Sequence, residues 1–384
     1  MAVLDGWTID EFICPIDRKP LSLVGERLVS PSGRQYPIVD GIPVFLLNDV
    51  EPTIGVARMS LERALGNTDV IDRRAPDMYL ESVSISDAEK ADLVRSLAAD
   101  TSARASPIDP VVLQLVGATN GLAYKHLIGD RKLAVYPVPD IGLPKSDGER
   151  LLDVGCSWGR WSLSAARKGY SVVGVDPCLG AVMAARRVAR QLGLDARFLV
   201  ADGRHLPFPD NSFDQAHSFS VLQHLSKQNA RMAFAEVGRV LRPGGSAKIQ
   251  MPNGWGVRSG LNQARRSFRE PTGFDVRFWS VPELRAAFAE CIGPTSITTH
   301  CYLGLGWLWS DYRYLRARHK PVLMLSECLT QLSRYFPPMV YVADSVFCAS
   351  RKIGPDTPWD ATNAVRRAAN ASGPRTKDTI GVLN

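Results

Sequence analysis

Between residues 148 and 252 the chain alternates regularly between short apolar runs and longer amphipathic segments. The apolar runs predict strands, and the Ala- and Arg-rich segments between them predict helices. The expected strands are 151–154, 171–175, 196–200, 213–218 and 247–251, and the expected helices are 160–168, 179–192 and 227–241. Because helices of this length connect parallel strands across the faces of a sheet, the alternation predicts an α/β fold with a doubly wound, mostly parallel sheet.

The segments on either side of this region have different patterns. Pro and Gly turns break up the first segment, the second is mostly helical in pattern, and the last is polar and aperiodic. The predicted domains are a small β-rich module (1–49), a helical linker and cap region (50–147), a core domain with insertions after residue 252 (148–352), and a disordered tail (353–384). Within the insertions we expect helices at about 281–290 and 320–334 and a closing strand at 339–348.

Composition and charge exclude few classes of protein. The formal net charge of +7 and the pI of about 9.1 permit binding to phosphates or anionic lipids without requiring it. We expect neither a membrane-spanning helix nor a secretory signal, because the chain lacks a run of ~18 uncharged apolar residues and a basic segment at its start. The seven cysteines include no CxxC pair, which predicts reduced thiols and a cytoplasmic protein.

The first predicted strand runs directly into a glycine-rich turn, DVGCSWG at 153–159, which opens a helix. Glycines let a ligand approach the backbone, and a helix N-terminus offers unpaired N–H groups. Taken alone, the turn also fits a dinucleotide site or a plain strand–turn–helix crossover. The GxxxG spacing differs from the GxGxxG of pyrophosphate sites, however, and Asp153 suits an ammonium better than a pyrophosphate.

Acidic residues end the next two predicted strands, as Asp176-Pro177 and Asp202-Gly203. A single Asp after a strand is usually only a helix cap. Asp176 follows the glycine turn by about 20 residues, the position from which an acid hydrogen-bonds ribose hydroxyls, and Asp202 is placed to accept from an adenine amino group. Three acids at the same edge of the sheet indicate a ligand site there.

Residues 148–252 resemble the class I S-adenosylmethionine-dependent methyltransferases, in the small-molecule subgroup that includes quinone, sugar and natural-product enzymes. LPFPDNSFD at 206–214, VLQHL at 221–225 and VLRPGG at 240–245 carry the resemblance beyond the glycine turn. It implies a Rossmann-like fold and S-adenosylmethionine as cofactor. The predicted cofactor-binding residues are Asp153, Gly155, Cys156, Gly159, Asp176, Pro177, Asp202, Gly203 and Ser218, with no metal ligand.

His224 is the candidate general base, since it follows the fourth strand, where the acceptor meets the methyl group in this family. Packing or capping of the next helix is the alternative role. The implied function is methyl transfer to a small molecule, foremost to an oxygen of a sugar, glycolipid or secondary metabolite. Five arginines after the fifth strand lie among aromatic residues and suit an anionic acceptor, although they also fit a solvated helix face: Arg258, Arg265, Arg266, Arg269 and Arg277.

Residues 12–47 resemble the small zinc-ribbon-like domain of tRNA-methyltransferase activators, with CP at 14–15 and YPIVDGIP at 36–43. The module is degenerate, because Asp17 replaces one cysteine and SPSG at 30–33 replaces the second pair. One cysteine cannot complete a tetrahedral zinc site. We therefore expect no zinc and a role as a hydrophobic mini-domain or docking surface.

Two other functions stay open. An RNA methyltransferase fits the basic charge and the kinship of the module, but the (N/D)PP(Y/F) signature and the Pro-Cys pair of two nucleic-acid-modifying groups are absent. The N-terminal module is the one feature that supports a non-catalytic partner subunit, in which it would serve for docking. Such a subunit has no need of the intact glycine turn and Asp176. Steep loss of RNA binding with salt would distinguish the RNA enzyme.

Overall fold

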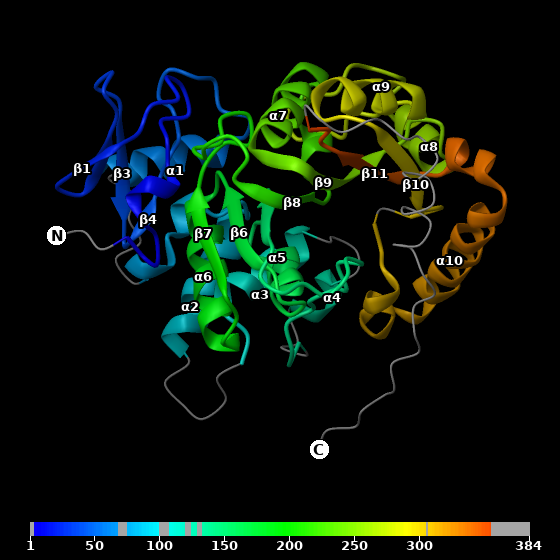
Figure 1. The fold of residues 1–384 in the computed structure, drawn as a ribbon. Coiled ribbons are helices and arrows are strands. Elements are labelled where there is room, and N and C mark those ends of the chain that lie inside the picture. Colours follow the sequence, from blue (N-terminus) through cyan, green and yellow to red (C-terminus); the bar gives the residue numbers. More distant parts are fainter. Residues whose placement is uncertain are drawn as a thin grey trace.

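A computed structural model describes residues 4–67, 75–99, 107–119, 124–128, 133–304 and 306–354 (Figure 1). Of the predicted tail at 353–384, only residues 353 and 354 belong to the described part of the chain.

A seven-stranded sheet forms the centre of the molecule and confirms the predicted fold. Its strands, in spatial order, are β10 (Thr295–Cys301), β11 (Ser345–Arg351), β9 (Leu241–Pro252), β8 (Phe213–Ser218), β5 (Arg150–Val154), β6 (Ser171–Asp176) and β7 (Ala196–Val200). The pairs from β9 to β7 are parallel, whereas β11 is antiparallel to both of its neighbours. The order reverses direction between β5 and β8, and ligands of such sheets bind outside the carboxyl ends of the strands at a reversal of this kind.

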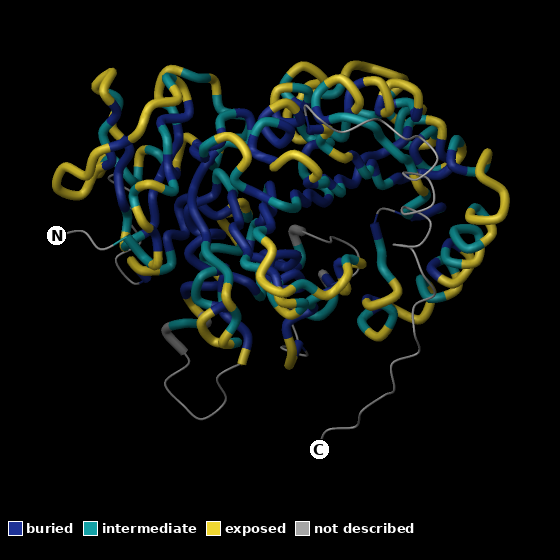
Figure 2. Tube along the Cα trace, in the orientation of Figure 1, coloured by how far each residue is buried: buried dark blue, intermediate teal, exposed yellow. Residues whose placement is uncertain are grey.

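Helices cover both faces of the sheet (Figure 1). The described helices are α1 (Gly55–Leu65), α2 (Asp87–Ala99), α3 (Pro110–Thr119), α4 (Lys125–Ile128), α5 (Arg160–Ala166), α6 (Leu179–Leu192), α7 (Lys227–Val240), α8 (Val257–Arg265), α9 (Val281–Cys291) and α10 (Lys320–Tyr335). One core contains Leu152 of β5 with Phe234 of α7 and Phe288 of α9. Side chains that point to the other face, such as Phe198 of β7, pack with α6 and α3. The two-sided burial explains why these strands are nearly continuous apolar runs, and Figure 2 shows the central strands in the colour of buried residues.

The N-terminal module is a four-stranded antiparallel sheet, β1 (Ser22–Val24), β2 (Arg27–Val29), β3 (Gln35–Val39) and β4 (Ile42–Pro43). It lies against the β7 edge of the large sheet, where Phe45 N donates to Val200 O at 2.7 Å. Phe12 and Phe45 belong to the same buried core as Phe208. The module is therefore packed into the core and covers an otherwise exposed strand edge.

Three features differ from the predictions made after residue 240. The Pro-Gly-Gly turn at 243–245 bulges out of β9, because Phe213 pairs with Leu241 while Gln215 already pairs with Ser246. The closing strand begins at Ser345 rather than 339, since 337–342 form a 3-10 helix, η8 (Pro337–Val342). The sheet also has an edge strand, β10, for which no prediction was made.

No helix in the described part of the chain combines the length and the hydrophobicity needed to span a bilayer.

Candidate active site

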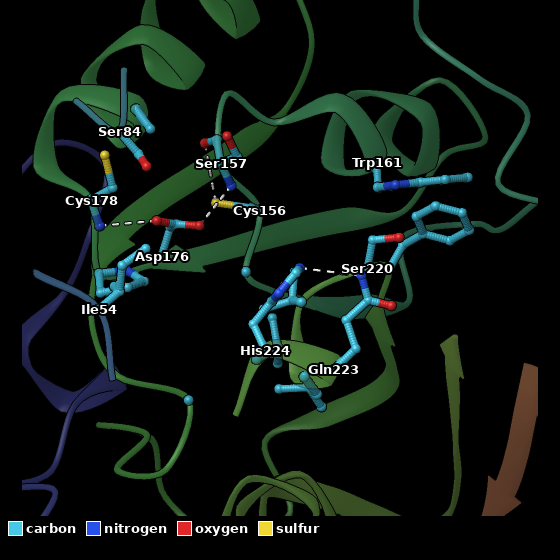
Figure 3. Close-up of a pocket in the computed structure, with 18 of the residues that line it drawn as sticks. Ile54, Ser84, Cys156, Ser157, Trp161, Asp176, Cys178, Ser220, Gln223 and His224 are labelled. Atoms are coloured by element: carbon cyan, nitrogen blue, oxygen red, sulfur yellow. Dashed lines mark hydrogen bonds between the residues drawn. The ribbon is translucent and has the colours of Figure 1, made fainter. Parts of the chain in front are cut away.

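A cavity of about 430 Å³ lies at the carboxyl ends of β5, β6, β7 and β8 (Figure 3). The glycine turn, the strand-end acids and the segment after β8 supply one part of its wall. Residues from outside the parallel strands supply the rest, among them Thr53, Ile54, Val56, Ser84, Leu115, Arg258, Phe274, Leu303, Gly304 and Trp307. The volume and the mixture of apolar walls with few polar groups are typical of a small-molecule site.

Gly155 gives the glycine turn its shape. Its φ is +78°, and a Cβ added there would lie 2.4 Å from both methyl carbons of Val221. Val221 follows β8 and also lines the cavity, so only glycine lets the two segments approach this closely. Gly159, with φ +83°, starts α5 but does not line the cavity; its own missing Cβ leaves room for Phe198 at 3.2 Å.

Asp176, the last residue of β6, lines the cavity with a carboxylate held from behind by two backbone donors. Ser157 N and Cys178 N each donate to one of its oxygens at 2.9 Å (Figure 3). Burial raises the pKa of Asp176 to about 6 despite these hydrogen bonds. Each oxygen can accept a further hydrogen bond, so the carboxylate is fixed in place and can still receive donors from a ligand.

Asp202 and Gly203 also line the cavity, but the carboxylate of Asp202 is already paired. Arg204 donates to both of its oxygens, with Nη2 at 2.7 Å from Oδ2. Arg204 is itself buried and donates to Glu51 O in the loop before α1. A Cβ on Gly203 would lie 2.9 Å from Val154, so glycine is required here for close packing.

Asp153 and Ser218 were predicted to contact the cofactor, but neither lines the cavity. Side chains alternate along a strand, and the carboxylate of Asp153 points towards α5, where it accepts from Ser162 Oγ at 2.6 Å. His217 Nδ1 lies 3.5 Å from the same carboxylate. Ser218 Oγ donates to Val154 O at 2.8 Å. Both residues therefore support the strand ends behind the turn, and their direct contact with the cofactor stays a prediction.

Cys156 and Pro177, the other two predicted contacts, line the cavity beside the turn and beside Asp176. Burial raises the pKa of the Cys156 thiol, which the Asp176 carboxylate raises further. Cys156 is thus a neutral thiol rather than a nucleophile.

His224 closes the 3-10 turn η5 (Leu222–His224) and lines the cavity opposite Asp176 (Figure 3). Its Nδ1 lies 2.8 Å from Phe274 O, which fixes Nδ1 as the protonated nitrogen of a neutral ring. The Gln223 amide nitrogen lies 3.2 Å from Nε2, and the ring also has a hydrogen bond with the backbone of Ser220 (Figure 3). The Phe274 ring stacks on the imidazole, with centroids 3.8 Å apart. Burial lowers the pKa of His224, so the ring is neutral at pH 7.

The five arginines that were predicted to bind an anionic acceptor have different surroundings in the structure. Among the five, only Arg258 lines the cavity. Arg277 donates to the carbonyls of His224, Gly273 and Asp275 at 2.7–2.8 Å, and so holds the loop that carries Phe274 over His224. Arg266 lies 3.8 Å from Asp275, while Arg265 and Arg269 are exposed.

The sequence predicted a cap from residues 50–147 without naming the side chains there that line the cavity, and it did not single out Trp161, Phe219 or Trp307. The rings of Trp161 and Phe219 lie tilted against each other with centroids 4.4 Å apart, and Trp307 lines the cavity from the insertion after β10. Trp161 follows the glycine turn closely enough to have been proposed. Ile54 and Ser84 carried no signal, because nothing in their local sequence relates them to strands a hundred residues away.

The positions at which the zinc-ribbon resemblance predicts cysteines lie close together. Asp17 accepts hydrogen bonds from Ser32 Oγ at 2.5 Å and from Lys19 N, and Ser32 contacts Ser30 Oγ at 2.8 Å. The Ser32 hydroxyl holds the pKa of Asp17 at about 2. Cys14 Sγ lies 3.0 Å from Tyr36 Oη. Nowhere in the described ranges do three His, Cys, Asp or Glu side chains form a group suited to a metal.

Known proteins resemble this chain in the part that forms the parallel strands. Residues 151–245 match the sequence model of a family described as a methyltransferase domain. Similar proteins include Methyltransferase GfsG of Streptomyces halstedii, 38% identical over 110 residues, which are 28% of this chain and 39% of that protein. Another is 24-methylenesterol C-methyltransferase 2 of Oryza sativa subsp. japonica, 42% identical over 106 residues (27% and 29%). A third is tRNA (carboxymethyluridine(34)-5-O)-methyltransferase of Schizosaccharomyces pombe, 32% identical over 126 residues (33% and 49%). The matched stretch thus spans less than half the length of each relative.

Proposed function

Because residues 151–245 match the methyltransferase-domain family, we propose that this chain is an S-adenosylmethionine-dependent methyltransferase. The observation that carries the proposal is Asp176, a carboxylate fixed by two backbone donors at the cavity wall, beside a turn that only glycine can form. A carboxylate at this strand end suits two ribose hydroxyls. When bound, S-adenosylmethionine supplies a methyl group on a sulfonium.

Each predicted cofactor residue then has a distinct role. Asp176 receives the ribose hydroxyls, while the backbone at Gly155, Cys156, Pro177 and Gly203 forms the surface that the cofactor contacts. Asp202, neutralised by Arg204, receives the adenine amino group. Asp153, Gly159 and Ser218 act through the turn, which they hold in place.

We place the acceptor between the aromatic side of the cavity and Arg258. Trp161, Phe219 and Trp307 offer an apolar surface; of the two arginines that line the cavity, Arg160 is paired with Asp311, which leaves Arg258 for an anionic group. This combination suits a small molecule with an apolar or ring-shaped body and an anionic group. An RNA backbone needs several phosphate contacts. Arg277 does not provide one, because its guanidinium already donates to backbone carbonyls. This favours a small molecule over RNA as the acceptor.

Binding of S-adenosylhomocysteine should depend on pH through Asp176. With the pKa of Asp176 near 6, the carboxylate is charged above that pH and accepts the hydroxyls; below it the proton competes. We expect constant affinity above about pH 7 and a loss of about tenfold per unit below about pH 6. Calorimetric titration between pH 5 and 8 measures this, and the Asp176→Asn variant should bind weakly with a flat profile. No binding by the wild-type chain at any pH would refute the proposed function.

His224 is proposed to take the proton from an acceptor hydroxyl at Nε2, in place of the hydrogen bond from Gln223. Replacing His224 with Ala should lower kcat by about 10²–10⁴-fold and leave cofactor affinity within twofold to threefold. Acceptors are found by incubating cell extracts with labelled cofactor, and turnover is then measured for the wild type and the variant. Equal turnover would assign His224 to holding Phe274 instead.

A further inference from the structure

An apolar stripe runs along the outer face of α10. Leu325, Cys328, Leu332 and Tyr335 recur at intervals of three and four residues, so they share one side of the helix. Leu325 is 51%, Leu332 52% and Tyr335 86% exposed, and Cys328 is exposed as well. The opposite side packs inward through Leu323. About half of the surface of Leu325 and of Leu332 is left uncovered by this chain, and apolar side chains gathered on the outward face of a surface helix indicate a contact surface.

The helix lies at the margin of the molecule. It packs on β10, the edge strand of the large sheet, and Figure 1 shows it as the outermost element on that side. Figure 2 shows exposed or half-buried residues along most of its length. A flat surface could therefore reach the stripe without meeting the rest of the protein.

A basic segment leads directly into this stripe. Residues 313–320, RYLRARHK, contain four arginines or lysines and a histidine but no acidic residue. Arg316 and Arg318 are exposed. Throughout the described ranges, no carboxylate lies within ion-pair distance of Arg316, Arg318 or Arg334, the exposed arginine near the end of α10. The charge of this segment is thus available to an external anionic surface.

The basic segment also adjoins the cavity. Leu303, Gly304 and Trp307 line the cavity, and the chain continues from them through η6 (Trp309–Tyr314) and η7 (Ala317–His319) into α10. The His319 ring lies 5.0 Å from the ring of Trp307. A surface bound at α10 would therefore be held near the side of the cavity where we place the acceptor.

We propose that the apolar stripe and residues 313–320 dock this protein on an anionic lipid bilayer. Apolar side chains on one face of a helix, flanked by arginines and lysines, are the pattern of helices that lie in the interface of such membranes. A second copy of this chain, meeting the first through the same surface, would present another basic segment rather than an acidic one. The docking goes beyond methyl transfer and needs no particular acceptor.

Vesicle binding tests the proposal on the full chain. An environment-sensitive fluorophore is attached to Cys328, with the half-buried Cys291 replaced by Ser, and the protein is mixed with phosphatidylcholine vesicles with or without phosphatidylglycerol. We expect a blue shift with the anionic vesicles only, which weakens as salt rises. A matched probe at Val24→Cys in a Cys328→Ser background, on the exposed β1 strand, should show no shift.

Sedimentation with the same vesicles, using unlabelled protein, measures the contribution of each part. Leu325→Glu and Leu332→Glu should each weaken binding by about tenfold or more, and Arg316→Gln and Arg318→Gln by about fivefold each. Val24→Glu is the matched control and should bind as the wild type does. The proposal is overturned if the wild type does not bind anionic vesicles, or if Leu325→Glu/Leu332→Glu binds equally well. It is also overturned if that variant instead abolishes a concentration-dependent dimer. S-Adenosylhomocysteine affinity of the same variants reports the proposed function separately.

Discussion

The Gly155→Ala variant is expected to lose measurable S-adenosylhomocysteine binding. Its Cβ would lie 2.4 Å from the methyl carbons of Val221, so the turn or the segment after β8 must move. The left-handed backbone at φ +78° adds about 1–2 kcal/mol of strain for any residue with a Cβ. Because Ser157 N in the same turn fixes Asp176, the displacement should also misplace the ribose-binding carboxylate. Calorimetry at neutral pH measures the loss.

Gly193→Ala separates strain from the steric clash. Gly193, the C-cap of α6, has φ +62° and no atom within 4 Å of an added Cβ. It should destabilise the fold by a similar strain energy and leave cofactor affinity unchanged. Adding Val221→Ala to Gly155→Ala removes the two methyl carbons and should restore part of the affinity. If Gly155→Ala binds as the wild type does, the close approach of the turn to Val221 has no role in cofactor binding.

The alternation of apolar and amphipathic segments was enough to predict the parallel sheet. Strands buried on both faces are apolar throughout, and the boundaries predicted for β6, α6 and β8 agree with the structure to within a residue. The edge strand β10, TSITTHC, is polar and half-buried, so no periodic signal marks it. The run from 339 to 348 looked like one strand because apolar residues of a 3-10 helix and of β11 follow one another.

The candidate site was predictable for residues at or just after the carboxyl ends of the parallel strands, because those ends meet at one edge of the sheet. Asp176 ends β6, Gly203 and His224 follow β7 and β8, and all three line the cavity at one edge of the sheet. Asp153 does not line the cavity, because its side chain, one residue before the end of β5, points towards Ser162. The partner of Asp202, Arg204, lies only two residues further along the chain, but nothing in the sequence indicated that it would neutralise that carboxylate.

Replacement of Asp311 with Ala is expected to cost the fold about 3–5 kcal/mol, the effect of leaving one partner of a buried ion pair unpaired. Arg160 Nη2 lies 2.8 Å from Asp311 Oδ1, and the two side chains are 7% and 2% exposed. Tyr124 Oη also donates to Asp311, and Arg160 Nε donates to Pro137 O at 3.1 Å. The pair thus joins α5 to η6 and to two segments that precede the core. Chemical denaturation of both proteins measures the difference.

Two further variants decide whether the missing partner causes this loss. Glu290→Ala breaks a pair with Arg231 whose side chains are 73% and 42% exposed, and should cost at most about 1 kcal/mol. The double variant Arg160→Met/Asp311→Leu removes both charges and keeps most of the volume, so it should be more stable than Asp311→Ala and close to the wild type. Arg160 also lines the cavity, so we expect the double variant to regain stability and still to bind ligand more weakly than the wild type. A double variant as unstable as Asp311→Ala would mean that packing around Tyr124, rather than the unpaired guanidinium, determines the loss.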